Sequence, residues 1–153
     1  MIRVGLISDT HGLLRPEALA WLQGSDFIVH AGDIGEPAVL ECLAQIAPLT
    51  VVRGNNDNAP WGRALPGATQ LQAGGLTLHV LHDLAELAID PHAAGIAAVI
   101  TGHSHQPHVE DRNGVLFVNP GSAGPRRFRL PIAAGELLIT DGRLQAHTVV
   151  LVA

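Results

Sequence analysis

The sequence predicts an α/β protein in which two β-sheets face each other and are flanked by helices. Two observations predict this class. Apolar strand segments alternate with helical segments in the first half, and strand pairs flank turn residues in the second half. The alternation favours parallel strands covered by helices. The strand pairs favour a second sheet that is largely antiparallel.

The first half supplies the expected parallel strands and their helices. Strands are expected at residues 3–8, 27–30 and 49–52, and helices at residues 16–22 and 37–47. Pro16 suits the first turn of a helix, and Pro48 ends the second one. The second helix also places Val39, Leu43 and Ile46 at helical spacing.

The second half supplies three expected hairpins and one further strand. The turns are Gly74-Gly75, Asn113-Gly114 and Asp141-Gly142. The paired segments are expected at residues 68–73 and 76–81, 108–111 and 115–119, and 136–140 and 143–151. A buried strand is expected at residues 97–101.

Length and composition suit one soluble domain over residues 1–153. The hydrophobic fraction is 47%, and no run approaches the roughly 18 to 20 apolar residues of a membrane span. The N-terminus lacks the pattern of a signal peptide, so a cytoplasmic location is expected. Cys42 is the single cysteine and excludes an intrachain disulfide.

The charge balance argues against a long nucleic acid as partner. The formal net charge is −5, and the basic residues cluster only at Arg126, Arg127 and Arg129. A duplex-binding protein usually shows a longer basic stripe. Aromatic residues make up 3% of the chain, too few to expect stacking platforms for single strands.

Polar clusters follow the predicted strands at five places and carry several of the nine histidines. Ligands of open α/β sheets bind beyond the carboxyl ends of the strands, so these clusters are expected to meet. Carboxylate, imidazole and amide oxygen suit Mn²⁺, Fe, Zn²⁺, Ni²⁺ or Mg²⁺ rather than a thiolate zinc site. The number of candidate ligands exceeds the needs of one ion and suits two ions sharing a carboxylate.

In order, these clusters resemble the motifs of the calcineurin-like metallophosphoesterases, and most closely the small phosphodiesterases of the YfcE type. The resemblance covers Asp9 to Arg126 and includes the segment Asn119-Pro120-Gly121-Ser122. The matching motifs are Asp9-Thr10-His11, Gly32-Asp33, Gly54-Asn55-Asn56-Asp57, His82 and Gly102-His103-Ser104-His105.

The resemblance implies an α/β/β/α sandwich of mixed sheets and a dinuclear metal site. By position, the first metal would be held by Asp9, His11 and His105. The second would be held by Asn55, His82 and His103, and Asp33 would bridge both. Mn²⁺ is the expected ion, with Ni²⁺, Fe, Zn²⁺ and Mg²⁺ as alternatives. The implied reaction is hydrolysis of a phosphate ester, a diester rather than a monoester, by a metal-bridging hydroxide.

Four further residues are expected to assist this chemistry. Asp57 and Asp83 are candidates for orienting ligand imidazoles, and Asn56 and Arg126 for contacting a phosphate oxygen. Two of these positions depart from the family pattern. Asn56 replaces a His or Cys and cannot supply a proton at neutral pH. Asp83 replaces a usual Gly, which predicts an altered substrate scope.

The sequence also offers a competing ligand histidine and an alternative function. His79 is a competitor of His82 as a ligand. His30, His92, His108 and His147 match no ligand position and are interpreted as structural or exposed. The alternative function is a metal-binding scaffold that acts through protein partners, as a retromer subunit of this fold does. A small phosphate ester is expected as substrate, with no membrane association. The sequence leaves the oligomeric state open, although the resemblance is compatible with a homodimer or homotetramer, which small family members often form.

Overall fold

The central strand of the first sheet is buried on both faces because its residues alternate between two cores. In β1 (Ile2–Ile7), Val4 and Leu6 face the second sheet, whereas Ile7 faces the helices. Gly5 lies against Leu22, where a Cβ atom would collide with that side chain. Helix α1 (Pro16–Leu22) can therefore pack closely on the strand.

The computed structural model describes residues 1–153 and contains two five-stranded sheets. The order of the first is β10-β9-β1-β2-β3, and the order of the second is β4-β5-β6-β8-β7. The remaining strands are β2 (Phe27–His30), β3 (Leu49–Val51), β4 (Ala68–Ala73), β5 (Leu76–Leu81), β6 (Ile96–Ile100), β7 (His108–Arg112), β8 (Val115–Asn119), β9 (Ile132–Thr140) and β10 (Arg143–Val152).

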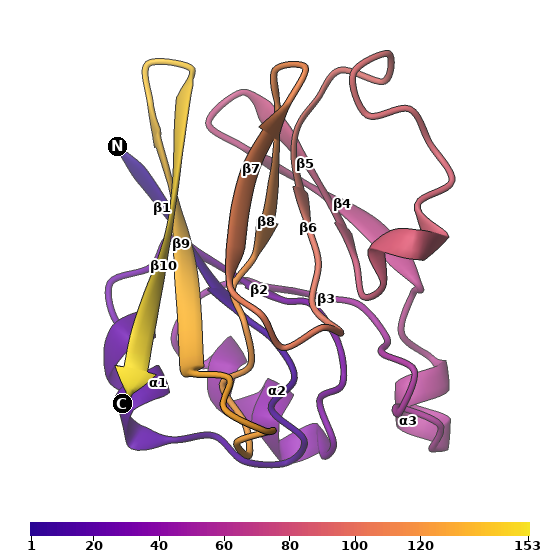
Figure 1. Cartoon of the computed structure of the whole chain (residues 1–153), viewed down its shortest axis with the longest axis vertical. Helices are drawn as coiled ribbons and strands as arrows, with labels where there is room; N and C mark the ends of the chain where they lie inside the picture. Colours follow the sequence, from indigo (N-terminus) through magenta and orange to yellow (C-terminus); the bar gives the residue numbers. More distant parts are fainter.

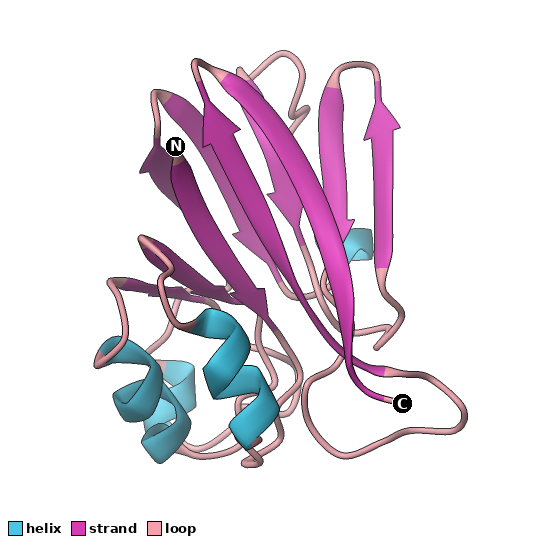
Figure 2. Cartoon of the chain, turned by 90° about the vertical axis from the view of Figure 1, so that its left-hand side faces the viewer, coloured by secondary structure: helices cyan, strands magenta, loops and turns pink.

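The sheets face each other across the main core, and the helices lie outside the first sheet (Figures 1 and 2). Val29 of β2, Leu78 of β5 and Ile100 of β6 meet between the sheets. Helices α1 and α2 (Pro37–Ala44) pack on the other face through Leu22 and Leu43. The expected pair of facing mixed sheets is thus confirmed.

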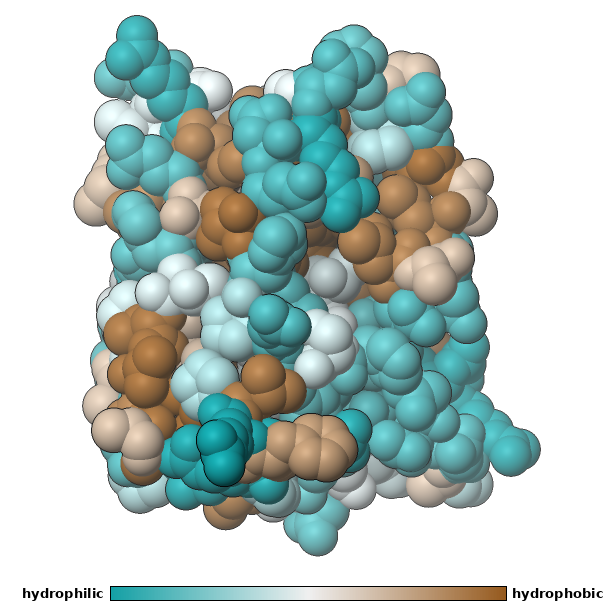
Figure 3. Space-filling model, viewed as in Figure 1, coloured by the Kyte–Doolittle hydropathy of each residue, from teal (hydrophilic) through white to brown (hydrophobic).

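The outer face of the second sheet has little helical cover. A 3₁₀ helix, η1 (Leu84–Glu86), contributes Leu84 to a small cluster around Val99 and Phe117. A one-turn helix, α3 (Pro60–Arg63), lies apart at the lower right of Figure 1. In the same view, Figure 3 shows a mostly hydrophilic surface in that region, with apolar residues gathered higher up and along the left edge. No helix of the structure is long and apolar enough to cross a bilayer.

Two topological expectations were wrong. The second sheet is mixed, as the resemblance implied, and is not largely antiparallel as the hairpins predicted, because β6 pairs in parallel with both β5 and β8. The third hairpin joins the first sheet, where β9 runs antiparallel to β1. The long crossover of residues 82–95 lets β6 return beside β5 in the same direction, whereas short hairpins link only β4 to β5, β7 to β8 and β9 to β10.

Element bounds differ from expectation mainly at the ends. Helix α2 stops at Ala44, because residues 45–47 form a turn before Pro48. Strand β9 begins at Ile132, four residues before its expected start at residue 136. Neither α3 nor η1 was expected. The expected bounds of α1, β2, β4, β5 and β8 are reproduced.

Candidate metal centre

The polar loops that follow β1, β2, β5 and β6 are joined by main-chain hydrogen bonds. The N–H of Asp9 donates to the carbonyl of Gly32 at 3.0 Å, and the N–H of His11 donates to that of Asp33 at 3.0 Å. The N–H of Gly102 donates to the carbonyl of His82 at 3.0 Å. These bonds join the loops within each sheet, and the His103 N–H, which donates to Oδ2 of Asp9 at 3.1 Å, joins the loops of the two sheets at one end of the sandwich.

Five of the seven predicted metal ligands converge there. Oδ1 of Asp9 lies 3.3 Å from Nε2 of His105 and 3.9 Å from Nε2 of both His11 and His82. Oδ2 of Asp33 lies 3.3 Å from Nε2 of His82 and 3.8 Å from Nε2 of His11. These atoms form two overlapping groups of possible metal ligands: Asp9, His11 and His105, and Asp9, Asp33 and His82.

The other two predicted ligands, Asn55 and His103, form a pair beside these five. Oδ1 of Asn55 lies 3.1 Å from Nδ1 of His103. The His103 ring is 5.2 Å from that of His82, centroid to centroid, and the His103 N–H donates to Oδ2 of Asp9 at 3.1 Å. Both side chains are more exposed than the five others, so this side of the cluster is open to solvent.

The backbone at these positions has an unusual conformation. Five of the eight non-glycine residues with a positive φ are predicted ligands: Asp9, His11, Asp33, His103 and His105. Such conformations cost about 1 to 3 kcal/mol each and cluster at functional sites. The local conformational energy of these five residues is thus raised where their side chains gather in one cluster.

Unpaired polar atoms show that the residues suit a cation. Four of the five buried side-chain nitrogen or oxygen atoms without a hydrogen-bond partner belong to predicted ligands: Oδ1 of Asp9, Nε2 of His11, Nε2 of His82 and Nδ1 of His105. Buried polar atoms are normally paired, and bound metal is one way to satisfy them. The donor set of carboxylate, imidazole and amide suits divalent transition metals.

Electrostatics keep the two carboxylates ionised. Burial would raise the pKa of Asp9, but His105, His82 and Ser8 hold that pKa below its usual 3.8. Burial opposes ionisation of Asp33 as well, and His82, the Asn56 N–H and His11 lower its pKa strongly. Burial lowers the pKa of His82, and the two carboxylates outweigh it and raise that pKa. The negative charge of Asp9 and Asp33, which stabilises a proton on His82, would also stabilise a bound metal cation.

Two serine hydroxyl groups, which were not predicted from the sequence, hold the Asp9 loop in place. Ser8 Oγ donates to Oδ2 of Asp9 at 2.7 Å, and Ser122 Oγ donates to its main-chain carbonyl at 3.0 Å. Ser122 lies in the 119–122 segment that carries part of the family resemblance, so its motif was the available signal. Ser8 offered no signal beyond its place before Asp9.

The Asp57 side chain holds main-chain loops in place and does not orient a ligand imidazole. Its buried carboxylate accepts hydrogen bonds from four main-chain N–H groups at 2.8 to 3.3 Å: those of Asp33, Ile34, Gly35 and Gly54. Asp57 therefore joins the loop after β2 to the loop after β3. The prediction that Asp57 orients a ligand imidazole is therefore wrong, because its carboxylate is occupied by these main-chain N–H groups.

Asn56 donates hydrogen bonds to the predicted metal ligand Asp33. Its side-chain amide and its main-chain N–H both donate to the carboxylate of Asp33, at 3.0 and 2.9 Å. To make the expected contact with a phosphate oxygen, the Asn56 side-chain amide would have to donate to that oxygen and to Asp33 together.

Asp83 and Arg126 lie in different surroundings. Oδ2 of Asp83 is 3.8 Å from Nε2 of His103, next to the cluster. The guanidinium of Arg126 donates to the main-chain carbonyls of Leu130 and Ala153, at 3.4 and 2.9 Å. The structure therefore directs Arg126 toward the C-terminus and does not bring it to the ligands.

The remaining histidines lie outside the ligand groups. His79 of β5 contacts Gln70 on the neighbouring strand at 3.3 Å, and burial lowers its pKa. His92, His108 and His147 are exposed. His30 is fully buried, accepts the Gly32 N–H at Nδ1 and contacts Thr10 Oγ1 through Nε2 at 2.9 Å. Its interpretation as structural is confirmed.

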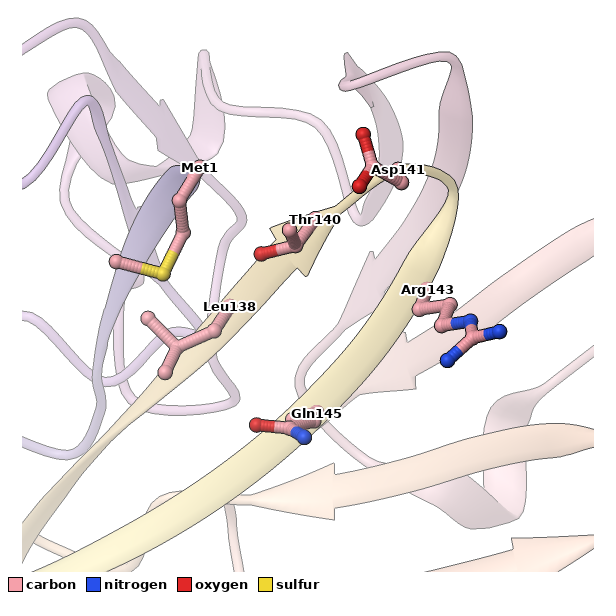
Figure 4. A pocket seen from close by; sticks show the side chains of 6 residues that line it. All are labelled: Met1, Leu138, Thr140, Asp141, Arg143 and Gln145. Atoms are coloured by element: carbon pink, nitrogen blue, oxygen red, sulfur yellow. The ribbon is translucent and has the colours of Figure 1, made fainter.

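The largest hollow of the surface is not the metal centre. It has a volume of about 560 Å³ and lies where the β9–β10 turn passes the N-terminus (Figure 4). Its lining residues are Met1, Leu138, Thr140, Asp141, Arg143 and Gln145. None is a predicted ligand, and this set offers neither an imidazole nor a group of carboxylates.

Comparison with known sequences agrees with the motif order. The profile of the calcineurin-like phosphoesterase superfamily domain matches residues 2–141. A probable metallophosphoesterase of Methanothermobacter thermautotrophicus is 30% identical over 151 residues, covering 91% of this chain and 86% of its own. One of Methanocaldococcus jannaschii is 29% identical over 159 residues, covering 95% and 80%.

Solved structures share the fold at lower sequence identity. An archaeal phosphodiesterase has a TM-score of 0.79 at 20% identity, covering 97% of this chain and 100% of its own. The YfcE phosphoesterase of E. coli has a TM-score of 0.69 at 21% identity, covering 98% and 100%. Vacuolar protein sorting 29 of Cryptosporidium parvum has a TM-score of 0.77 at 20% identity, covering 97% and 96%.

Proposed function

The chain belongs to the calcineurin-like phosphoesterase superfamily, and on this premise we propose that it is a dinuclear-metal phosphodiesterase. The proposal rests chiefly on the convergence of Asp9, Asp33, His11, His82 and His105, where Oδ1 of Asp9 and Nε2 of His11 and His82 are buried without a hydrogen-bond partner. Asp9, His11 and His105 would hold one ion, and Asn55, His82 and His103 the other. Asp33 would contact both, as the family resemblance implies, and its Oδ2 atom lies 3.8 Å from Nε2 of His11 and 3.3 Å from Nε2 of His82.

Bound divalent ions would supply Lewis-acid activation of water and of the phosphoryl group, and Mn²⁺ is the expected ion. The protein residues fix the geometry for this chemistry. Ser8 and Ser122 hold Asp9 in place, Asp57 holds the loop that carries Asp33, and Asn56 holds the Asp33 carboxylate itself. His82 donates from Nδ1 to the carbonyl of Ala31 at 2.7 Å, which leaves Nε2 free to act as a ligand.

A diester suits this site better than a monoester. A phosphodiester carries one negative charge, whereas a monoester at neutral pH carries nearly two. Arg126 is directed at the C-terminus, and no arginine lines the hollow beside His103. Arg53 lines the neighbouring hollow, but its guanidinium donates to the carbonyls of Arg63 and Leu65. The fold shared with an archaeal phosphodiesterase supports the same choice. Asn56 cannot donate a proton to a leaving group, so esters with good leaving groups should react fastest.

The test is turnover of bis-p-nitrophenyl phosphate and p-nitrophenyl phosphate by metal-stripped protein with and without Mn²⁺. We expect Mn²⁺-dependent hydrolysis and a preference for the diester. Asp33→Asn should abolish turnover, whereas Asp111→Asn in an exposed hairpin should not. Tight metal binding without hydrolysis of either ester would overturn the proposal and favour the scaffold.

A further inference from the structure

A hollow of about 390 Å³ opens directly beside His103. It is lined by Asp83, Leu84, Thr101, Gly102, His103, Ser104, Gln106, His108 and Asn119. Its size is within the range of small-molecule sites. Because His103 is a proposed ligand, a substrate whose phosphoryl group sits at the metals would place one of its ester groups in or near this hollow.

Asp83 is the only lining residue with a fixed charge. Its Oδ1 atom accepts the Ala85 N–H at 3.0 Å, whereas its Oδ2 atom lies 3.8 Å from Nε2 of His103, beyond hydrogen-bond distance. The Asp83 side chain is 35% exposed. One carboxylate oxygen is thus held in place, and the other is free to meet a positively charged group.

The rest of the wall is pre-organised and carries no fixed positive charge. The Asn119 amide donates to the Gly102 carbonyl at 2.8 Å and to Ser104 Oγ at 3.0 Å. Ser104 Oγ also accepts the Gln106 N–H at 3.2 Å. Leu84 adds an apolar surface. A second phosphate or a carboxylate would find no cationic side chain here and would face Asp83.

We propose that this hollow binds one ester group of the substrate and that Asp83 selects an alkylammonium group there. The proposal rests on the proposed phosphodiesterase activity and narrows its substrate class to diesters of amino alcohols. A partly exposed ion pair contributes up to about 1 kcal/mol, so a preference of about fivefold over a neutral isostere is expected.

The competing role of Asp83 is to orient His103 alone. That role would affect every substrate to the same extent, because the metal centre is common to all of them. Cation selection would affect only substrates that carry the ammonium group. A ratio between two substrates of equal shape separates these roles, since any general loss of activity cancels.

The matched pair is p-nitrophenyl phosphorylcholine and p-nitrophenyl 3,3-dimethylbutyl phosphate, which differ in charge but hardly in shape. We expect the ratio of their kcat/KM values to be about 5 in the wild-type protein and close to 1 in Asp83→Asn. Glu86→Gln is the control, because Glu86 lines the neighbouring hollow with Asp83 but not this one. It should keep the wild-type ratio. A wild-type ratio at or below 1, or an unchanged ratio in Asp83→Asn, would overturn the proposal.

Binding of the product-like monoesters separates this proposal from the activity on which it rests. Calorimetric titration of the Mn²⁺-loaded protein with phosphocholine and with 3,3-dimethylbutyl phosphate needs no turnover. If neither diester is hydrolysed, the proposed phosphodiesterase function fails. In that case, tighter binding of phosphocholine that is lost in Asp83→Asn still supports the cation subsite, and equal binding refutes it.

Discussion

The side-chain amide of Asn56 donates to Oδ2 of Asp33 at 3.0 Å while the Asn56 main-chain N–H donates to Oδ1 of the same carboxylate at 2.9 Å. Asn56 therefore holds the residue proposed to contact both metals. Asn56→Ala should weaken Mn²⁺ binding about tenfold, because partners of metal ligands typically contribute that much or more. Calorimetric Mn²⁺ titration measures it. Gln145→Ala, on an exposed part of β10, should bind Mn²⁺ like the wild type. Equal affinity of Asn56→Ala and wild type would refute this role.

Asp57→Ala should destabilise the metal-free protein by at least about 3 kcal/mol. The substitution leaves four main-chain N–H groups without their acceptor, and each buried donor costs about 1 to 3 kcal/mol. Urea denaturation measures the loss. Asn58→Ala, an exposed neighbour, should change the free energy of unfolding by less than about 0.5 kcal/mol. Similar losses of unfolding free energy in both variants would contradict the role of Asp57 in joining the two loops.

His30 should make the metal-free protein less stable as the pH falls from about 6.5 to 4. Burial lowers the pKa of His30 from 6.5 to about 4 in the folded protein. The unfolded chain therefore binds more protons in this window, and stability is complete above pH 6.5 and lost below it. The expected loss is roughly 3 kcal/mol. Asp9 and Asp33 titrate below 3.8, and the raised pKa of His82 acts at and above 6.5.

Comparison with His30→Gln isolates this effect. Glutamine has an amide but no titratable group, so its curve of unfolding free energy against pH should be flatter than that of the wild type between pH 6.5 and 4. Parallel curves for the two proteins would show that His30 does not carry the dependence.

Gly102→Ala should damage the metal centre without a change in any ligand. A Cβ atom at Gly102 would collide with Ser8 Oγ and Asp9 Oδ2. Overpacking of this kind costs about 1 to 3 kcal/mol of stability, and we expect Mn²⁺ affinity to fall with it. Gly67→Ala is the matched control, since a Cβ there would meet only Arg53 at an ordinary contact distance of 3.5 Å. A Gly102→Ala protein with wild-type Mn²⁺ affinity would contradict the packing argument.

The first half of the fold could be predicted from local signals, and the second half only in part. Prolines and apolar spacing locate α1 and β2 to the residue. The hairpin turns locate strands but do not reveal that β6 inserts between β5 and β8. That order depends on packing over the long 82–95 connection, which has no periodic pattern. Helix α3 is four residues long and too short to show a period.

The ligand positions could be predicted because ordered motifs locate them, and the supporting contacts could not. Asp57 is conspicuous in the sequence, but its four main-chain partners come from two loops that meet only in the folded protein. Ser8 and Thr10 look like ordinary turn residues in the sequence. Arg126 lies within the expected motif, yet its contact with the carbonyl of Ala153 joins residues 27 positions apart.

Anomalous diffraction from a crystal of the Mn²⁺-loaded protein shows whether seven side chains hold two cations at the end of the sandwich. We expect two peaks about 3.5 to 4 Å apart with Asp33 between them. One should contact Asp9, His11 and His105, and the other Asn55, His82 and His103. A single peak, or peaks at other residues, would refute the dinuclear site.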